Sequence, residues 1–249
     1  MAQARTRTRI SHRTLDGTLV TLAGPLELDR PYSSVIRLTF LRRLHELTAV
    51  DRVFGEDWAR TVGVPRLTEE FRLQGGRLRV GEAVVRDDSL RDFPARRRRS
   101  AGDRVLAAVW EGRRHAVCAH LYHAGPADAV RLFDAVRITE HPEGIAVTPR
   151  RGRGAAVAET ATVAKDVPGV GLLEIAPLNR ETSRQLPRWR GTRLATGELF
   201  RDTHGDGATY FVMATPTAVV TVLPDEAEVR AAPARLNGLA VEAAGLERP

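Results

Sequence analysis

The sequence contains one cysteine, Cys118, and one lysine, Lys165, among 249 residues. A single cysteine cannot form an intramolecular disulfide, which excludes the small extracellular domains that are held together by such bonds. Aromatic residues make up only 5% of the chain. Proteins that stack single-stranded bases on an exposed sheet carry prominent surface aromatics, so this composition argues against that class.

Long apolar runs are also missing. No stretch reaches the ~20 apolar residues that a transmembrane helix requires. The first nine residues are basic, but no apolar segment follows them, so the pattern of a secretory signal is absent. These features predict that the protein has no transmembrane segment and that it functions in the cytoplasm.

Positive charge is abundant. The formal net charge is +7, and 37 of the 38 basic residues are arginine. Only two asparagines occur, so a GC-rich coding sequence explains the arginine content, and the arginines then lie on solvated surfaces. The alternative is a polyanionic partner, because arginine binds phosphate through two parallel hydrogen bonds. The residues for such contacts would be Arg96, Arg97, Arg98, Arg99, Arg151 and Arg153.

The pattern predicts an α+β fold with antiparallel β-sheets in two halves, one long helix near the N-terminus and short helices crossing each half. The long helix is expected from Ser33 to Leu47, because apolar residues recur there at spacings of three and four. A short helix is expected over residues 56–62, with Trp58 on its buried face. The apolar stripe of the long helix consists of Val35, Ile36, Leu38, Leu41, Leu44 and Leu47.

Two hairpins follow from alternating polarity around glycine-containing turns. The first covers residues 67–85 and turns at Gly75-Gly76, and the second covers residues 104–122 and turns at Gly112. Pro126 suits the first position of a short helix.

The chain is expected to divide into a loose basic tail (1–16), an α+β half (17–150), a linker (151–158) and a β-rich half (159–249). Residues 116–147 and 219–242 both read as strand, proline, short helix and strand, which suggests an internal duplication. Chance similarity of turn chemistry is the alternative, and the halves could also form one continuous domain.

Four residues form the densest chemical cluster: His115, Cys118, His120 and His123. On a strand they point to opposite faces two by two, so they do not supply the three or four converging ligands of a zinc site. No metal and no cofactor are therefore expected. The candidates for catalysis are His115, Cys118, His120 and His204, although Cys118 lies in an apolar strand that favours an inert thiol.

Residues 202–207 carry two carboxylates and a histidine, but their aspartates and glycines are typical of a tight turn. Trp189 lies between Arg188 and Arg190. An exposed tryptophan is a natural anchor of a protein interface, so these three residues are candidate binding residues.

The absence of a coherent catalytic pattern favours a non-catalytic binding or assembly protein that acts through protein–protein contacts. Two alternatives remain open. One is a nucleic-acid-binding protein that uses the arginine-rich loops, and the other is an enzyme with a pocket between the two halves.

Overall fold

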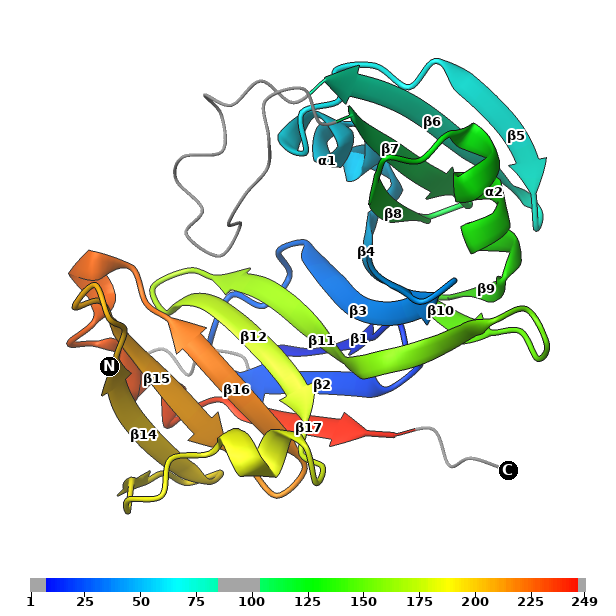
Figure 1. The fold of residues 1–249 in the computed structure, drawn as a ribbon. Coiled ribbons are helices and arrows are strands. Elements are labelled where there is room, and N and C mark those ends of the chain that lie inside the picture. Colours follow the sequence, from blue (N-terminus) through cyan, green and yellow to red (C-terminus); the bar gives the residue numbers. More distant parts are fainter. Residues whose placement is uncertain (1–7, 85–103, 246–249) are drawn as a thin grey trace. The chain divides into compact units, whose positions relative to one another are not determined.

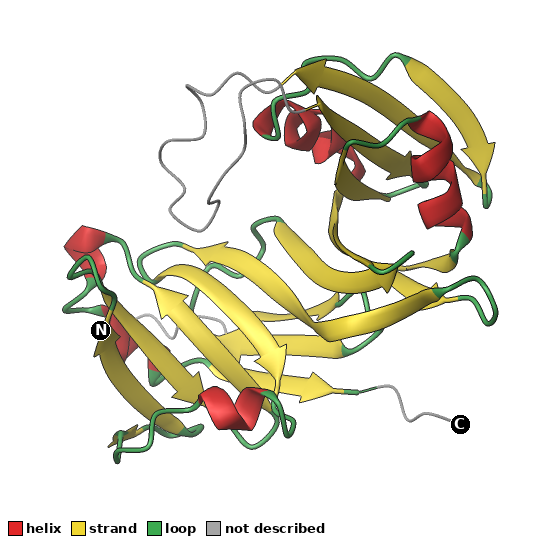
Figure 2. Cartoon of the chain, in the orientation of Figure 1, coloured by secondary structure: helices red, strands yellow, loops and turns green. Residues whose placement is uncertain are grey.

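The computed structural model describes residues 8–84 and 104–245 and consists mainly of β-strands (Figures 1 and 2). Of these residues, 53% lie in strands and 14% in helices. The expected α+β class with one long helix is therefore wrong. The described residues contain three short α-helices and two large antiparallel sheets.

Two compact units interleave along the chain. The first comprises Met1–Val35, His141–Ala146 and Thr160–Pro249, and the second comprises Ile36–Glu140 and Val147–Glu159. Strands β3, β9, β10 and β11 contribute residues to both units. Residues 155–158 of the expected linker belong to β11. The expected boundary between two halves stays a prediction.

The first unit is a β-sandwich. It contains the strands β17-β2-β1-β10 of the five-stranded sheet and the strands β13-β14-β15-β16-β12-β11 of the 12-stranded sheet. Apolar side chains of β2 and β17 pack against those of β11, β12, β15 and β16, which buries the core between the sheets. The elements are β1 (Thr8–Arg13), β2 (Leu19–Gly24), β10 (Gly144–Pro149), β11 (Ala155–Val167), β12 (Gly171–Pro177), η3 (Thr182–Gln185), β13 (Thr192–Arg193), β14 (Glu198–Thr203), β15 (Thr209–Ala214), β16 (Ala218–Leu223), η4 (Glu226–Glu228), α3 (Ala232–Leu236) and β17 (Ala240–Ala244).

The second unit contains the strands β3-β4-β8-β7-β6-β5 of the 12-stranded sheet, and its short helices contact strands β5 to β8. Helix α1 packs on β7 and β8, where Ala59 joins the buried side chains of Val109 and Cys118. Helix α2 contacts β5 and β6. The elements are β3 (Tyr32–Phe40), β4 (Arg43–Asp51), η1 (Arg52–Phe54), α1 (Gly55–Thr61), β5 (Glu69–Leu73), β6 (Gly76–Val84), β7 (Arg104–Glu111), β8 (His115–Tyr122), α2 (Pro126–Asp134) and β9 (Val136–His141).

The segment expected to be the long helix forms strands β3 and β4, joined by a two-residue turn at Leu41-Arg42. Burial along β3 alternates, with Ile36, Leu38 and Phe40 inside. This period of two, carried by residues with high β-propensity, determines the local structure. Leu41 and Leu44 completed the apparent helical stripe, yet they are 61% and 55% exposed.

Several local predictions are confirmed. Helix α1 forms, and its Trp58 is half-buried against the hydrophobic cluster that contains Val109 and Cys118. Pro126 begins α2. The two glycine-containing hairpins form as β5–β6 and β7–β8. Residues 8–13 form β1 within the region expected to be a loose tail. Both segments of the suggested duplication contain strands around a short helix, α2 or α3, and the duplication stays a prediction.

Candidate ligand cavity in the second unit

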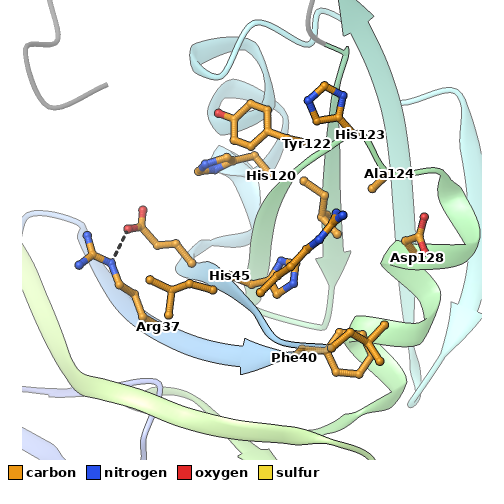
Figure 3. Close-up of a pocket in the computed structure, with 13 residues that line it drawn as sticks. Arg37, Phe40, His45, His120, Tyr122, His123, Ala124 and Asp128 are labelled. Carbon is orange, nitrogen blue, oxygen red and sulfur yellow. Dashed lines mark hydrogen bonds and ion pairs between the residues drawn. The ribbon is translucent and has the colours of Figure 1, made fainter. Parts of the chain in front are cut away.

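A cavity of about 960 Å³ opens where strands β4 and β8 diverge. The two strands pair from Leu47 with Ala119 to Asp51 with His115. The residues beyond this ladder, 43–46 on β4 and 120–122 on β8, line the cavity together with the loop before α2. Figure 3 shows that its side chains come from three elements: the β3–β4 hairpin, the end of β8 and the start of α2.

Backbone strain is concentrated around this cavity. Leu41, Arg42 and His123 adopt φ angles of 49°, 61° and 51°, in the left-handed region that L-residues other than glycine rarely enter. Of the positive-φ non-glycine residues that the structure describes, only Gln74 lies elsewhere. Such strain persists where the surrounding structure enforces it, and it is common at binding sites.

The cavity has an apolar wall. Phe40 and Leu121 are buried, whereas Leu41 and Leu44 are more than half exposed at the rim. Single exposed leucines need no explanation, but two of them beside a cavity offer apolar area to a ligand.

The charged groups of the lining are mostly paired within the protein. Glu46 accepts a hydrogen bond from the Nε–H of Arg37 at 3.2 Å. The Nη1 of the same guanidinium contacts the carboxylate of Glu159. Asp128 accepts the backbone N–H of Gly125 at 2.9 Å and contacts a guanidinium of α2. These hydrogen bonds, the backbone one foremost, lower the pKa of Asp128.

Arg43 differs from the other charged residues of the lining. Within the part of the chain that the structure describes, its guanidinium makes no ion pair and no hydrogen bond, although it lies close enough to influence His45 and Asp128 electrostatically. Among the described residues, Arg43 is therefore the one charged group of the lining whose hydrogen-bond donors are unused.

Three imidazoles surround the opening. Burial, the largest effect, and the charge of Arg43 lower the pKa of His45 and together outweigh a hydrogen bond with the backbone of Phe40, which raises it. His120 lies 6.2 Å from the ring of Trp58 and meets Tyr122 edge-on at 5.4 Å. His45, His120 and His123 come from β4, β8 and the loop after β8, as Figure 3 shows.

Replacing Leu41-Arg42 with Asn-Gly is expected to stabilise the second unit by about 1 kcal/mol, because Asn-Gly suits a turn with two positive φ angles. Urea unfolding followed by circular dichroism would measure the change. Arg42→Lys, which retains an L-side chain with a positive charge, serves as the control and should leave the stability unchanged. A destabilised Asn-Gly variant would contradict the assignment of strain to this turn.

The structure separates the residues considered for catalysis. His120 lines the cavity, whereas His115 lies at the opposite end of β8, with its Nδ1 3.5 Å from Glu140. His204 belongs to the first unit, where it is exposed in the β14–β15 turn and stacks on Tyr210. Cys118 is fully buried, and burial raises its pKa, so its thiol is protonated and inaccessible. Among the described residues, no group of three or more His, Cys, Asp or Glu side chains is placed to hold a metal ion.

The residues considered for binding lie apart from this cavity. Trp189 is 52% exposed, and the flanking Arg188 and Arg190 are exposed as well. Arg153 contacts Asp134 at 3.5 Å, and Arg151 is exposed in the turn before β11. Arg96, Arg97, Arg98 and Arg99 lie outside the described residues. A protein interface at Trp189 stays a prediction.

Sequence reasoning missed most of the residues that line the cavity. Arg37, Phe40, Arg43 and His45 lie in the segment that the spacing assigns to a helix, and none of them belongs to its predicted apolar stripe. The signal that could have found them is the alternation of Ile36, Leu38 and Phe40, which predicts a strand and hence a turn.

Comparison with models of protein families, with curated proteins and with solved structures finds no match. No helix among the described residues is long and apolar enough to cross a membrane.

Proposed function

We propose that this chain is a non-catalytic binding protein and that the cavity between β4 and β8 takes a small amphipathic anion. The observation that carries the proposal is an exposed apolar wall beside the guanidinium of Arg43, which makes no ion pair or hydrogen bond with the described residues. Such a ligand would place its apolar body on Leu41 and Leu44 and its acidic group at Arg43.

The size and polarity of the cavity support this class of ligand. Small-molecule sites are concave, occupy ~300–1,000 Å³ and combine apolar walls with a few polar groups, and the volume here is about 960 Å³. Both carboxylates of the lining already have partners, so an anionic ligand meets no unpaired negative charge. His45 hydrogen-bonds the backbone of Phe40, so within this lining the donor offered to an oxyanion is the guanidinium of Arg43.

Dodecanoate and dodecan-1-ol would test the proposal, because they share an apolar body and differ in charge. We expect calorimetric titration to show tighter binding of dodecanoate. Arg43→Gln should weaken dodecanoate binding about tenfold, as expected for the loss of a charge-assisted hydrogen bond. The same substitution should leave dodecan-1-ol unaffected. Leu44→Ser should weaken the binding of both molecules.

Leu223→Ser is the matched control, because Leu223 is also an exposed leucine but lies on β16 of the first unit. It should bind dodecanoate as the wild type does. Equal affinity for acid and alcohol, or an Arg43→Gln variant with unchanged affinity, would contradict the proposal. Chemical conversion of a bound ligand would contradict its non-catalytic part.

A further inference from the structure

A second groove of the second unit, of about 650 Å³, gathers arginine side chains at the turn ends of β5, β6 and β7. Four arginines and one acidic residue, Glu111, line this arginine groove. It lies at the start of β8, where Gly112 and Arg113 precede the strand, whereas the amphipathic cavity lies at the end of β8. The four arginines are Arg52, Arg72, Arg77 and Arg113.

The single carboxylate is already engaged. Glu111 is 7% exposed. Its carboxylate accepts hydrogen bonds from the Nη2 of Arg77 at 2.9 Å and from the Nη1 of Arg79 at 3.1 Å. Arg52 lies 4.0 Å from the same carboxylate. The lining holds one acidic residue and four arginines, and Glu70 outside the lining contacts Arg77 at 3.7 Å, so the groove keeps an excess of positive charge.

Two of the arginines have no counter-ion among residues 8–84 and 104–245. The guanidinium groups of Arg72 and Arg113 make no ion pair and no hydrogen bond there, and both side chains are exposed. Exposed arginines are common, so exposure alone does not define a site. What sets these apart is their convergence on one concave groove.

The strand register places like charges directly opposite each other. Arg72 pairs with Arg77 across β5 and β6, and Arg77 pairs with Glu111 across β6 and β7, so the three side chains form one row on one face. Like charges in direct opposition destabilise a sheet. Glu111 and Glu70, the latter 3.7 Å from Arg77, already offset the charge of Arg77, so a bound anion would chiefly compensate the charge of Arg72.

We propose that the arginine groove binds a phosphoryl group carried by a small molecule, such as a phosphate monoester or a diphosphate. The guanidinium fork matches the oxygens of a phosphoryl group, and Arg72 and Arg113 supply donors that no described residue uses. This site is independent of the amphipathic anion cavity, and either can fail without the other.

The probe is inorganic pyrophosphate, titrated by calorimetry into the full chain at low and at physiological salt. We expect Arg72→Gln and Arg113→Gln each to weaken binding about tenfold, in line with the loss of a charged hydrogen bond. Arg72→Lys retains the charge but not the fork and should fall between wild type and Arg72→Gln. Thermal unfolding would confirm that the variants are folded.

Arg184→Gln is the control, since Arg184 is exposed on η3 of the first unit and its loss changes the net charge equally. It should bind pyrophosphate as the wild type does. Equal weakening by Arg184→Gln would show a diffuse charge effect and overturn the proposal. Binding of a single-stranded oligonucleotide without binding of pyrophosphate would also overturn it, in favour of a nucleic-acid surface.

Discussion

Acidification from pH 7 to pH 4 is expected to lower the unfolding free energy by about 3 kcal/mol through His12 alone. His12 lies on β1 of the first unit and is 4% exposed. Its ring stacks on Tyr32 at 4.0 Å, and its Nε2 has no hydrogen-bond partner among the described residues. Burial, and secondarily the nearby charge of Lys165, lowers the pKa of His12 to about 3.

The sign follows from proton uptake. The unfolded chain protonates His12 near its ordinary pKa of about 6.5, whereas the folded chain resists protonation until about pH 3. Between these values the unfolded state binds more protons, so stability falls as the pH falls. The contribution of the neutral His12 ring to the unfolding free energy is fully present above about pH 6.5 and has been lost below about pH 3.

His12→Phe should remove this dependence while retaining the stacked ring on Tyr32. Urea unfolding at pH 4, 5.5 and 7 would measure it, with the variant losing about 3 kcal/mol less than the wild type across that range. His204→Phe is the control, because His204 is exposed on the same unit. Identical losses in wild type and His12→Phe would rule out a buried neutral imidazole.

Lys165 shows how a composition count missed a structural role. The sequence marked it only as the single lysine of an arginine-rich chain. In the structure it is 1% exposed, donates to the backbone carbonyl of Arg30 and has its pKa lowered by burial to about 8. Its position in the sandwich depends on the pairing of β11 with β12, and these long-range contacts are not visible in local patterns.

The parts of the fold that sequence reasoning predicted are those with local turn chemistry. Gly75 and Gly112 mark the β5–β6 and β7–β8 hairpins, and Pro126 marks the start of α2. The β3–β4 hairpin lacks this chemistry, because Leu41-Arg42 occupies positions that usually require glycine or asparagine. The amphipathic cavity depends on that hairpin, so the cavity could not be predicted without recognising the strained turn.

Glu140→Ala is expected to destabilise the second unit by about 3 kcal/mol, because one carboxylate organises the whole β7–β8 turn. Its oxygens accept the backbone N–H groups of Arg113, Arg114 and His115 at 2.8, 3.0 and 3.1 Å. Each charge-assisted hydrogen bond contributes about 1.5–3 kcal/mol, so the sum of the three exceeds the expected loss of about 3 kcal/mol. The side chain is 23% exposed, so water replaces part of the loss.

The protonation of Glu140 supports the same assignment. Burial alone would raise its pKa, but the three backbone N–H groups outweigh burial and lower it. The folded state therefore favours the carboxylate. This contribution to stability is present above the ordinary pKa of a glutamate and is lost as the pH falls through the lowered value.

Urea unfolding at pH 7 would measure Glu140→Ala beside Glu140→Gln, which retains one acceptor oxygen and should lose about half as much. Glu69→Ala is the matched control, an exposed glutamate of the same unit, and should change stability by less than about 0.5 kcal/mol. A loss below about 1 kcal/mol for Glu140→Ala would mean that water satisfies the turn. Because Glu140 fixes the backbone of Arg113, a folded Glu140→Gln should also bind pyrophosphate more weakly, whereas Glu69→Ala should not.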